Sequence, residues 1–240
     1  MNASRIRTIV AGLATVLLLA GCNGSDDDVF ASTVRYRVEV TNLTHAQPLS
    51  PLGVVLHDDG YSAFRIGETA STELERLAEG GDAGSLLAAA DSDDAVEATA
   101  AGAGAVAPGA TDSLEIETRV RSPKSLRLTV LSMLVNTNDA FTGARSVNVG
   151  ELAKGEELEL QGVSYDSGTE ANSETADTIP GPAAAGGAQE GFSSDRDDVV
   201  DDVRMHGGVV TADDGLAGSV LTAANRWDNP VVRIVITRLE

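Results

Sequence analysis

Three acidic residues in two short polar segments have the spacing of a cation site. Asp139 lies in the segment 136–143, Asn-Thr-Asn-Asp-Ala-Phe-Thr-Gly, directly after an apolar run. Asp166 and Glu170 lie in the segment 165–170, Tyr-Asp-Ser-Gly-Thr-Glu, on either side of Gly168, so both carboxylates can turn toward one point. If the strands that carry the two segments pair, Asp139 reaches the same point. Such carboxylates, with backbone carbonyls and water, suit calcium, which takes about six to eight oxygen ligands.

Spacing alone leaves a second interpretation open. Asp, Asn and Gly are also the residues that most often form turns, because their side chains bond to nearby backbone and they tolerate left-handed conformations. The two segments are therefore either a calcium site or plain turns. The acidic run 195–202 is interpreted as a solvated loop, and we assign it no site.

A second candidate is His206, which precedes Asp213 and Asp214. A histidine near two aspartates would suit a transition metal or acid–base chemistry. The simpler interpretation is a glycine-rich loop followed by an Asp-Gly turn. The three histidines show no ligand spacing and no His-Glu-x-x-His motif, so we expect no zinc site here.

Motifs for nucleophilic catalysis are missing from the sequence. A Gly-x-Ser-x-Gly elbow, which would expose a reactive serine at a sharp turn, does not occur. We therefore expect no enzyme. The rival classes are a hydrolase of the cell envelope and a structural lipoprotein that binds no ligand.

The elements that would position these residues read mainly as β-strands. Segment 33–43 alternates apolar and polar residues, with Val34, Tyr36, Val38 and Val40 on one face, which is typical of a strand with one solvated side. Segment 125–135 is apolar along much of its length, so we expect a central strand. The other expected strands are 52–57, 111–120, 146–149, 156–162 and 230–239, and residues 91–110 and 167–198 read as loops.

Two short helices are expected between the strands at 52–57 and 111–120. Segment 67–80 has Ser71 or Thr72 as its cap, Leu74 and Leu77 facing inward and Gly80 at its end, and a second helix covers 83–90. Many short strands with few helices favour an all-β fold, an antiparallel sandwich with inserted helices.

The amino-terminal segment resembles the export signal of a lipoprotein. Arg5 and Arg7 precede an apolar run that is too short to span a membrane, and the run ends in Leu-Ala-Gly before Cys22. We expect residues 1–21 to be removed, Cys22 to carry lipid, 22–32 to be a tether, and 33–240 to be one domain. Because Cys22 is the only cysteine, the mature domain would have no disulfide.

The charge of the chain excludes some partners. The formal net charge is −20, with 37 acidic against 17 basic residues. Nucleic-acid binding depends on Lys and Arg neutralising phosphates, so we expect no nucleic-acid partner. Anionic lipid headgroups should also repel this chain. Attachment to the membrane would then depend on the lipid of Cys22.

Four phrases of the sequence are similar to the spondin N-terminal domain family. They are Tyr-Arg-Val-Glu-Val-Thr-Asn-Leu-Thr at 36–44, the segments 136–143 and 165–170, and the closing stretch from Trp-Asp-Asn-Pro at 227–230 to Leu239. The resemblance covers nearly all of the mature chain. It implies an eight-stranded antiparallel β-sandwich with one calcium ion, whose side-chain ligands here would be Asp139, Asp166 and Glu170.

The same resemblance implies a non-catalytic adhesion or interaction module. The chain departs from animal members in having Glu170 in place of Asp, Ala140 in place of Trp, and no disulfide cysteines. These changes bear on the adhesion partner more than on the ion. We expect an extracytoplasmic lipoprotein that meets a partner in the envelope or on a cell surface. In an envelope with two membranes, it would lie at the outer membrane or on the periplasmic face.

Overall fold

The computed structural model describes residues 31–185 and 191–240. The expected signal peptide, Cys22 and most of the tether lie outside these ranges. Within them, no helix has the length and apolar character that a membrane crossing requires.

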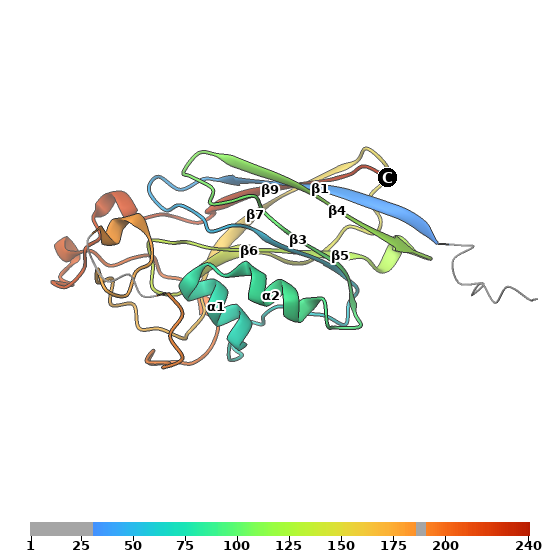
Figure 1. The fold of residues 1–240 in the computed structure, drawn as a ribbon. Coiled ribbons are helices and arrows are strands. Elements are labelled where there is room, and N and C mark those ends of the chain that lie inside the picture. Colours follow the sequence, from blue (N-terminus) through green and yellow to red (C-terminus); the bar gives the residue numbers. More distant parts are fainter. Residues whose placement is uncertain (1–30, 186–190) are drawn as a thin grey trace, which may run out of the picture. The chain divides into compact units, whose positions relative to one another are not determined.

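Nine strands and two α-helices form the domain (Figure 1). The strands are β1 Ser32–Asn42, β2 Gly53–His57, β3 Val96–Ala101, β4 Thr111–Val120, β5 Arg127–Met133, β6 Ala140–Asn148, β7 Glu157–Asp166, β8 Arg204–Met205 and β9 Val232–Arg238. The helices are α1 Thr72–Gly80 and α2 Ala83–Ala90. Single-turn 3₁₀ helices cover Pro123–Ser125, Pro182–Ala184, Ala212–Asp214 and Ala223–Asn225. Every strand pair is antiparallel, so the expected all-β antiparallel class is confirmed.

The strands form one continuous sheet in place of the expected eight-stranded sandwich. The order is β3-β2-β5-β6-β7-β9-β1-β4, with β8 paired to β7. The sheet curves into two facing layers. β7 belongs to both of them, because its first half pairs with β9 and its second half with β6. The strand changes partner at Gly162, where a Cβ would lie 2.9 Å from the Gly143 carbonyl oxygen. β4 and β3 approach at the open edge through Thr118 Oγ1 and Glu97 Oε2, 3.4 Å apart, so the sheet is nearly closed and barrel-like.

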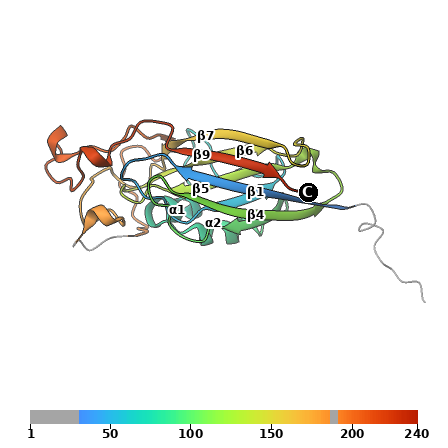
Figure 2. The ribbon, with the colours of Figure 1, turned by 90° about the horizontal axis from the view of Figure 1, so that it is seen from above.

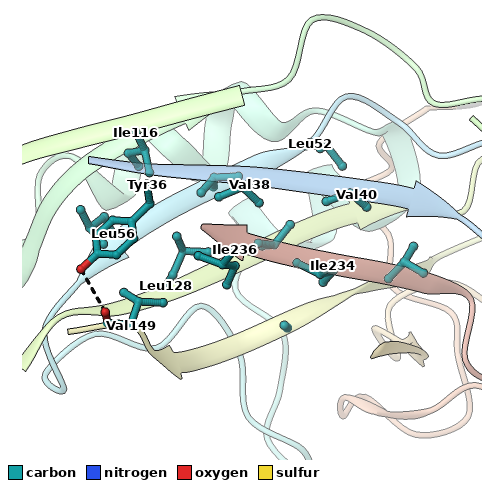
Figure 3. Close-up of a cluster of buried hydrophobic side chains, with 14 of the residues drawn as sticks. Tyr36, Val38, Val40, Leu52, Leu56, Ile116, Leu128, Val149, Ile234 and Ile236 are labelled. Carbon is teal, nitrogen blue, oxygen red and sulfur yellow. Dashed lines mark hydrogen bonds between the residues drawn. The ribbon is translucent and has the colours of Figure 1, made fainter. Parts of the chain in front are cut away.

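The main core fills the space between the two layers (Figure 3). The inward faces of β1 and β9 contribute alternating residues, such as Val38, Val40, Ile234 and Ile236, all at most 1 % exposed. Tyr36 is also fully buried, and its hydroxyl donates to the Val149 carbonyl at 3.1 Å. The polar alternate residues of β1 face outward, as its sequence pattern predicts.

A second apolar cluster lies beneath β2, β5 and β6, where α1 and α2 cover the sheet (Figure 1). Leu74 and Leu77 of α1 contact this cluster, and Ser71 caps the helix by accepting from the Leu74 N–H. Since β2 and β5 are covered on both sides, nearly all of their residues are buried. The expectation of a central strand at 125–135 is thereby confirmed.

Four strand assignments differ from expectation. β3 lies within the segment 91–110, which we predicted to be a loop. The prediction was wrong because Val-Glu-Ala-Thr-Ala-Ala has few strand-forming residues, and the strand lies at the edge of the sheet. β6 begins at Ala140, inside the first polar segment, and β7 extends to Asp166. β8 has only two residues.

The two ends of the barrel differ in character. β1 begins beside the carboxyl terminus, where Arg35 bonds to Glu240 at 3.0 Å. It ends at Asn42, next to the loops that carry the polar segments. Figure 2 shows β7, β9, β1 and β4 side by side, with the long segments 170–185 and 191–230 gathered at the end opposite to the start of β1. We call this the loop end.

Candidate cation site at the loop end

Pairing of β6 with β7 brings the two polar segments together. Asp139 directly precedes β6, and Asp166 is the last residue of β7. Because Ala140 lies opposite Asp166 in the register, the two aspartates are at the same end of the strand pair. Asp139 and Asp166 are 0 % and 3 % exposed. Strand pairing thus brings the carboxylates of Asp139 and Asp166 close together, whereas Glu170, the third carboxylate expected at this point, is not part of the group.

Asp139 has one fully bonded oxygen and one without a partner. Its Oδ2 accepts from Ser167 Oγ at 2.9 Å, from the Thr169 N–H at 2.9 Å and from the Glu170 N–H at 3.2 Å. Its Oδ1 is buried and has no hydrogen-bond partner among the described residues. A buried carboxylate oxygen without a partner costs free energy, so Oδ1 is the atom of this group at which a cation or a hydrogen-bond donor would be accommodated.

Asp166 has partners on both oxygens. Oδ1 accepts from the Gly168 N–H at 2.9 Å and lies 3.0 Å from Nη2 of Arg204, while Oδ2 accepts from Asn172 Nδ2 at 2.9 Å. The Gly168 bond closes a tight turn that needs glycine, because φ at this residue is +76°. Asp166 is thus oriented before any ion arrives.

His206 is the third member of the group. Single ligand atoms of Asp139, Asp166 and His206 all lie within 4.8 Å of one another. β8 brings the histidine there, since its pairing places Arg204 opposite Asp166 and lets the His206 N–H donate to the Ser164 carbonyl at 3.1 Å. The interpretation of His206 as a plain loop residue missed this position, because only the pairing of the two-residue β8 determines it.

The His206 ring offers the group a hydrogen-bond donor. Its Nδ1 accepts from the Gly208 N–H at 3.0 Å, and burial lowers its pKa. A neutral ring that accepts at Nδ1 carries its proton on Nε2, which is buried and without a partner among the described residues. A histidine that ligates a metal usually gives its second N–H to an acceptor. The opposite arrangement at Gly208 makes His206 a poor ligand for zinc.

Glu170 lies beside the group and outside it. Its carboxylate oxygen Oε1 accepts from Asn138 Nδ2 at 2.9 Å, and only its backbone contacts Asp139. The side chain is 8 % exposed. To contribute a ligand oxygen, Glu170 would turn from Asn138 toward Asp139, so its role as a ligand stays a prediction.

Several buried carboxylates near the site have raised pKa values. Burial, with the neighbouring Asp166, raises the pKa of Asp139 to about 6. Burial also raises the pKa of Glu170 to about 8 and that of Glu79 and Glu174 to about 7, with Asp139 contributing repulsion to each. The cluster disfavours its own negative charge, which a bound cation would offset.

Glu174 is a member of this cluster that sequence reasoning missed. It is fully buried, its Oε2 has no partner among the described residues, and its φ of +56° is uncommon for a residue other than glycine. Its backbone N–H donates to Asn138 Oδ1 at 3.0 Å. The sequence gives no local signal for this conformation, because a tertiary contact imposes it.

The acidic run that we interpreted as a solvated loop folds against the site. Arg204 contacts Asp198 as well as Asp166, and its Nη1 donates to the Val200 carbonyl at 2.7 Å. A Cβ on Gly168 would lie 2.4 Å from the Asp202 carbonyl oxygen, so the run packs directly on the turn after Asp166. The run is therefore part of the surroundings of the site.

The other sequence candidates lie apart from the group. Asp214 closes a capping box with Thr211 at the start of a 3₁₀ helix and pairs with Arg226. Trp227 is half-buried, and its Nε1 donates to Ser164 Oγ at 2.9 Å while its ring lies 5.3 Å from that of His206. These residues support the loop end and supply no ligand atom to the group.

The donor set fits a hard cation. It provides a buried carboxylate oxygen without a partner on Asp139 and a carboxylate of fixed orientation on Asp166, whereas the unpartnered nitrogen of His206 carries a proton. Carboxylate oxygens are the ligands that calcium prefers, and thiolate or free imidazole ligands would favour zinc.

Comparison with known protein families gives a match that covers much of the chain. The family model described as Spondin_N matches residues 42–182, more than half of the chain, and this range includes Asp139, Asp166 and Glu170 but ends before His206. No curated protein matches the chain.

Proposed function

We propose that this chain, which belongs to the spondin N-terminal domain family, is an extracytoplasmic interaction module whose loop end is stabilised by one calcium ion. Family membership supports the coarser statement of an extracellular, non-enzymatic interaction domain. The observation that carries the ion is the buried Oδ1 of Asp139, which has no partner among the described residues and lies beside Asp166.

In this proposal Asp139 and Asp166 hold the ion, and Glu170 turns from Asn138 to provide a further carboxylate. The bound ion supplies positive charge to a cluster in which burial raises carboxylate pKa values. It also links the segment before β6 to the end of β7. The chain's own residues position the site, since Gly168 and Asn172 fix Asp166 and three donors fix Asp139.

The attachment to a membrane is part of the proposal. It is supported by the Leu-Ala-Gly-Cys sequence at 19–22. Replacing Cys22 with Ser should release the protein from the membrane fraction.

Thermal unfolding of the purified protein tests the ion. A ligand that binds only the folded state stabilises it by about 2.7 kcal/mol when its concentration is a hundredfold above Kd. We expect millimolar calcium to raise the melting temperature relative to EDTA, and zinc to have no comparable effect. Equal melting temperatures in calcium and EDTA would contradict the ion and leave the interaction module as a structural domain without a metal.

A further inference from the structure

Two consecutive exposed valines lie on the segment that packs on the turn after Asp166, and two more exposed apolar side chains lie on the same or an adjoining segment. Val199 is 94 % exposed, and Val200, Met205 and Ile66 are 48 %, 50 % and 57 % exposed. Apolar side chains scattered singly on a surface need no explanation, but a contiguous group often marks an interaction site. We call Val199 and Val200 the apolar tip.

Backbone hydrogen bonds place these residues on two adjoining segments. The Gly67 N–H donates to the Val203 carbonyl at 2.8 Å, and the Val203 N–H donates to the Glu68 carbonyl at 3.0 Å. Thr69 Oγ1 donates to the Asp201 carbonyl at 3.1 Å. Ile66 therefore lies on a segment that runs beside the one carrying the apolar tip and Met205.

Two arginines and the turn at Gly168 fix the backbone that carries the apolar tip. Arg196 bonds to Asp201 at 2.8 Å, to the buried Glu75 at 2.7 Å and to the Ala70 carbonyl at 2.9 Å. Arg204 bonds to the Val200 carbonyl at 2.7 Å, and the backbone of 200–202 packs on Gly168. These contacts fix the backbone of the turn in a conformation in which Val199 is exposed to solvent.

The charged residues around the apolar tip indicate which kind of partner it would bind. Asp197, Asp198, Asp201 and Asp202 flank the two valines, and Arg196 and Arg204 neutralise them only in part. The whole chain is also strongly acidic. An anionic membrane would be repelled by these carboxylates. A protein surface with Lys and Arg around an apolar pocket would be complementary in both charge and hydrophobicity.

We infer that the apolar tip, with Met205 and Ile66 beside it, is the docking surface for a basic partner protein whose Lys and Arg residues surround an apolar pocket. The inference rests on the proposed function as an interaction module and names the partner class that this function leaves open. The tip lies at the loop end, because the backbone of residues 200–202 packs on Gly168, two residues after the end of β7.

A binding experiment with a peptide probe tests the inference. The full chain is captured on a sensor surface through a carboxyl-terminal tag, and a 14-residue peptide of alternating Leu and Lys is the probe. We expect saturable binding that weakens at least tenfold in the double variant Val199→Ser, Val200→Ser. Leu43→Ser is the matched control, because Leu43 is 46 % exposed and lies on a different segment, and it should bind as the wild type does.

Two further binding measurements make the outcome decisive. A Ser/Lys peptide of the same charge should bind at least tenfold more weakly, which separates docking from bare charge attraction. Vesicles of three parts phosphatidylcholine to one part phosphatidylglycerol should not bind. The inference is overturned if the peptide fails to bind, if the valine variant binds it unchanged, or if the vesicles bind through the same valines.

The same proteins separate this inference from the proposed ion. Melting temperatures of the wild type and the valine variant are measured in calcium and in EDTA. A calcium effect that persists in the valine variant, together with lost peptide binding, supports both. Valine-dependent peptide binding without any calcium effect supports the docking surface and rejects the ion, and the reverse result rejects the docking surface alone.

Discussion

The guanidinium of Arg204 lies 3.0 Å from Oδ1 of Asp166, so a positive side chain occupies the edge of the candidate cation site. Arg204 also contacts Asp198 and the Val200 carbonyl. The same residue therefore bonds to a proposed ion ligand and to the turn that carries the apolar tip. Ion binding and the position of the apolar tip should depend on each other through this arginine.

Replacing Arg204 with Gln should have opposite effects with and without calcium. In EDTA, the buried Asp166 loses its charged partner, so we expect a loss of about 1–3 kcal/mol in the free energy of unfolding. Calcium should bind about tenfold more tightly, because a neighbouring positive charge is removed, as calorimetric titration would measure. Arg226→Gln, which breaks the pair with Asp214, is the control and should leave calcium affinity unchanged.

Asp139→Asn should abolish the calcium response while preserving the fold. The amide oxygen still accepts from Ser167 and Thr169, but the negative charge and the free Oδ1 are gone. Because burial already raises the pKa of Asp139 to about 6, stability in EDTA should be unchanged or about 1 kcal/mol higher. Denaturant unfolding in EDTA and in calcium measures both effects. Asp213→Asn, at an exposed turn, should keep the full calcium response.

Trp227 should report ion binding by its fluorescence. It is the only tryptophan in the chain, its Nε1 donates to Ser164, and its ring lies 5.3 Å from that of His206. A cation between Asp139 and Asp166 changes the field on the adjacent imidazole and indole. We expect calcium to shift or quench the emission of the wild type and to leave that of Asp139→Asn unchanged. An identical response in both proteins would place the ion elsewhere.

Gly168→Ala should destabilise the loop end by steric overlap. The new Cβ would lie 2.4 Å from the Asp202 carbonyl oxygen in a residue whose φ is +76°. We expect a loss of about 2–4 kcal/mol on thermal unfolding, since backbone must shift as well as adopt strain. Gly155→Ala is a matched control, because φ there is +82° but no atom lies within 4 Å. It should cost only about 1 kcal/mol, and equal losses would refute the packing of 198–202 on Gly168.

His57 should make stability depend on pH apart from the cation site. Its Nδ1 donates to the Asp58 carbonyl and its Nε2 bonds to Thr129 Oγ1 at 2.9 Å. Burial lowers its pKa and Arg127 contributes, while Asp58 and Asp93 oppose this. The unfolded state therefore binds the proton more tightly, so this contribution to stability is present above pH 6.5 and is lost as pH falls toward the folded pKa.

The neutral variant His57→Gln isolates that contribution. Between pH 7 and pH 5 the wild type should lose stability relative to the variant by up to about 1.4 kcal/mol per pH unit. Denaturant unfolding at each pH in EDTA measures the difference. Parallel pH profiles for the two proteins would show that His57 keeps its ordinary pKa in the fold.

Local patterns in the sequence predicted much of the fold. The alternation from Val34 to Val40 predicted which face of β1 is buried, and Ser71 and Gly80 marked the first helix within a residue of its limits. The segment 125–135, apolar along much of its length, predicted a central strand, and β5 within it is buried along nearly its whole length. These features follow from backbone geometry and capping within a few residues, so a single segment contains the information. The sequence also indicated Asp139 and Asp166 as candidate ligands, because Asp139 comes shortly after the segment of β5 and Asp166 lies at the end of β7.

The tertiary structure alone decided the closure of the sheet and the third side chain of the site. β7 serves both layers because it changes partner at Gly162, and its own sequence pattern does not name those partners. His206 reaches Asp139 and Asp166 through the two residues of β8, far along the chain from both. Pairing between distant segments depends on the packing of the whole domain, and residue spacing along one segment does not encode it.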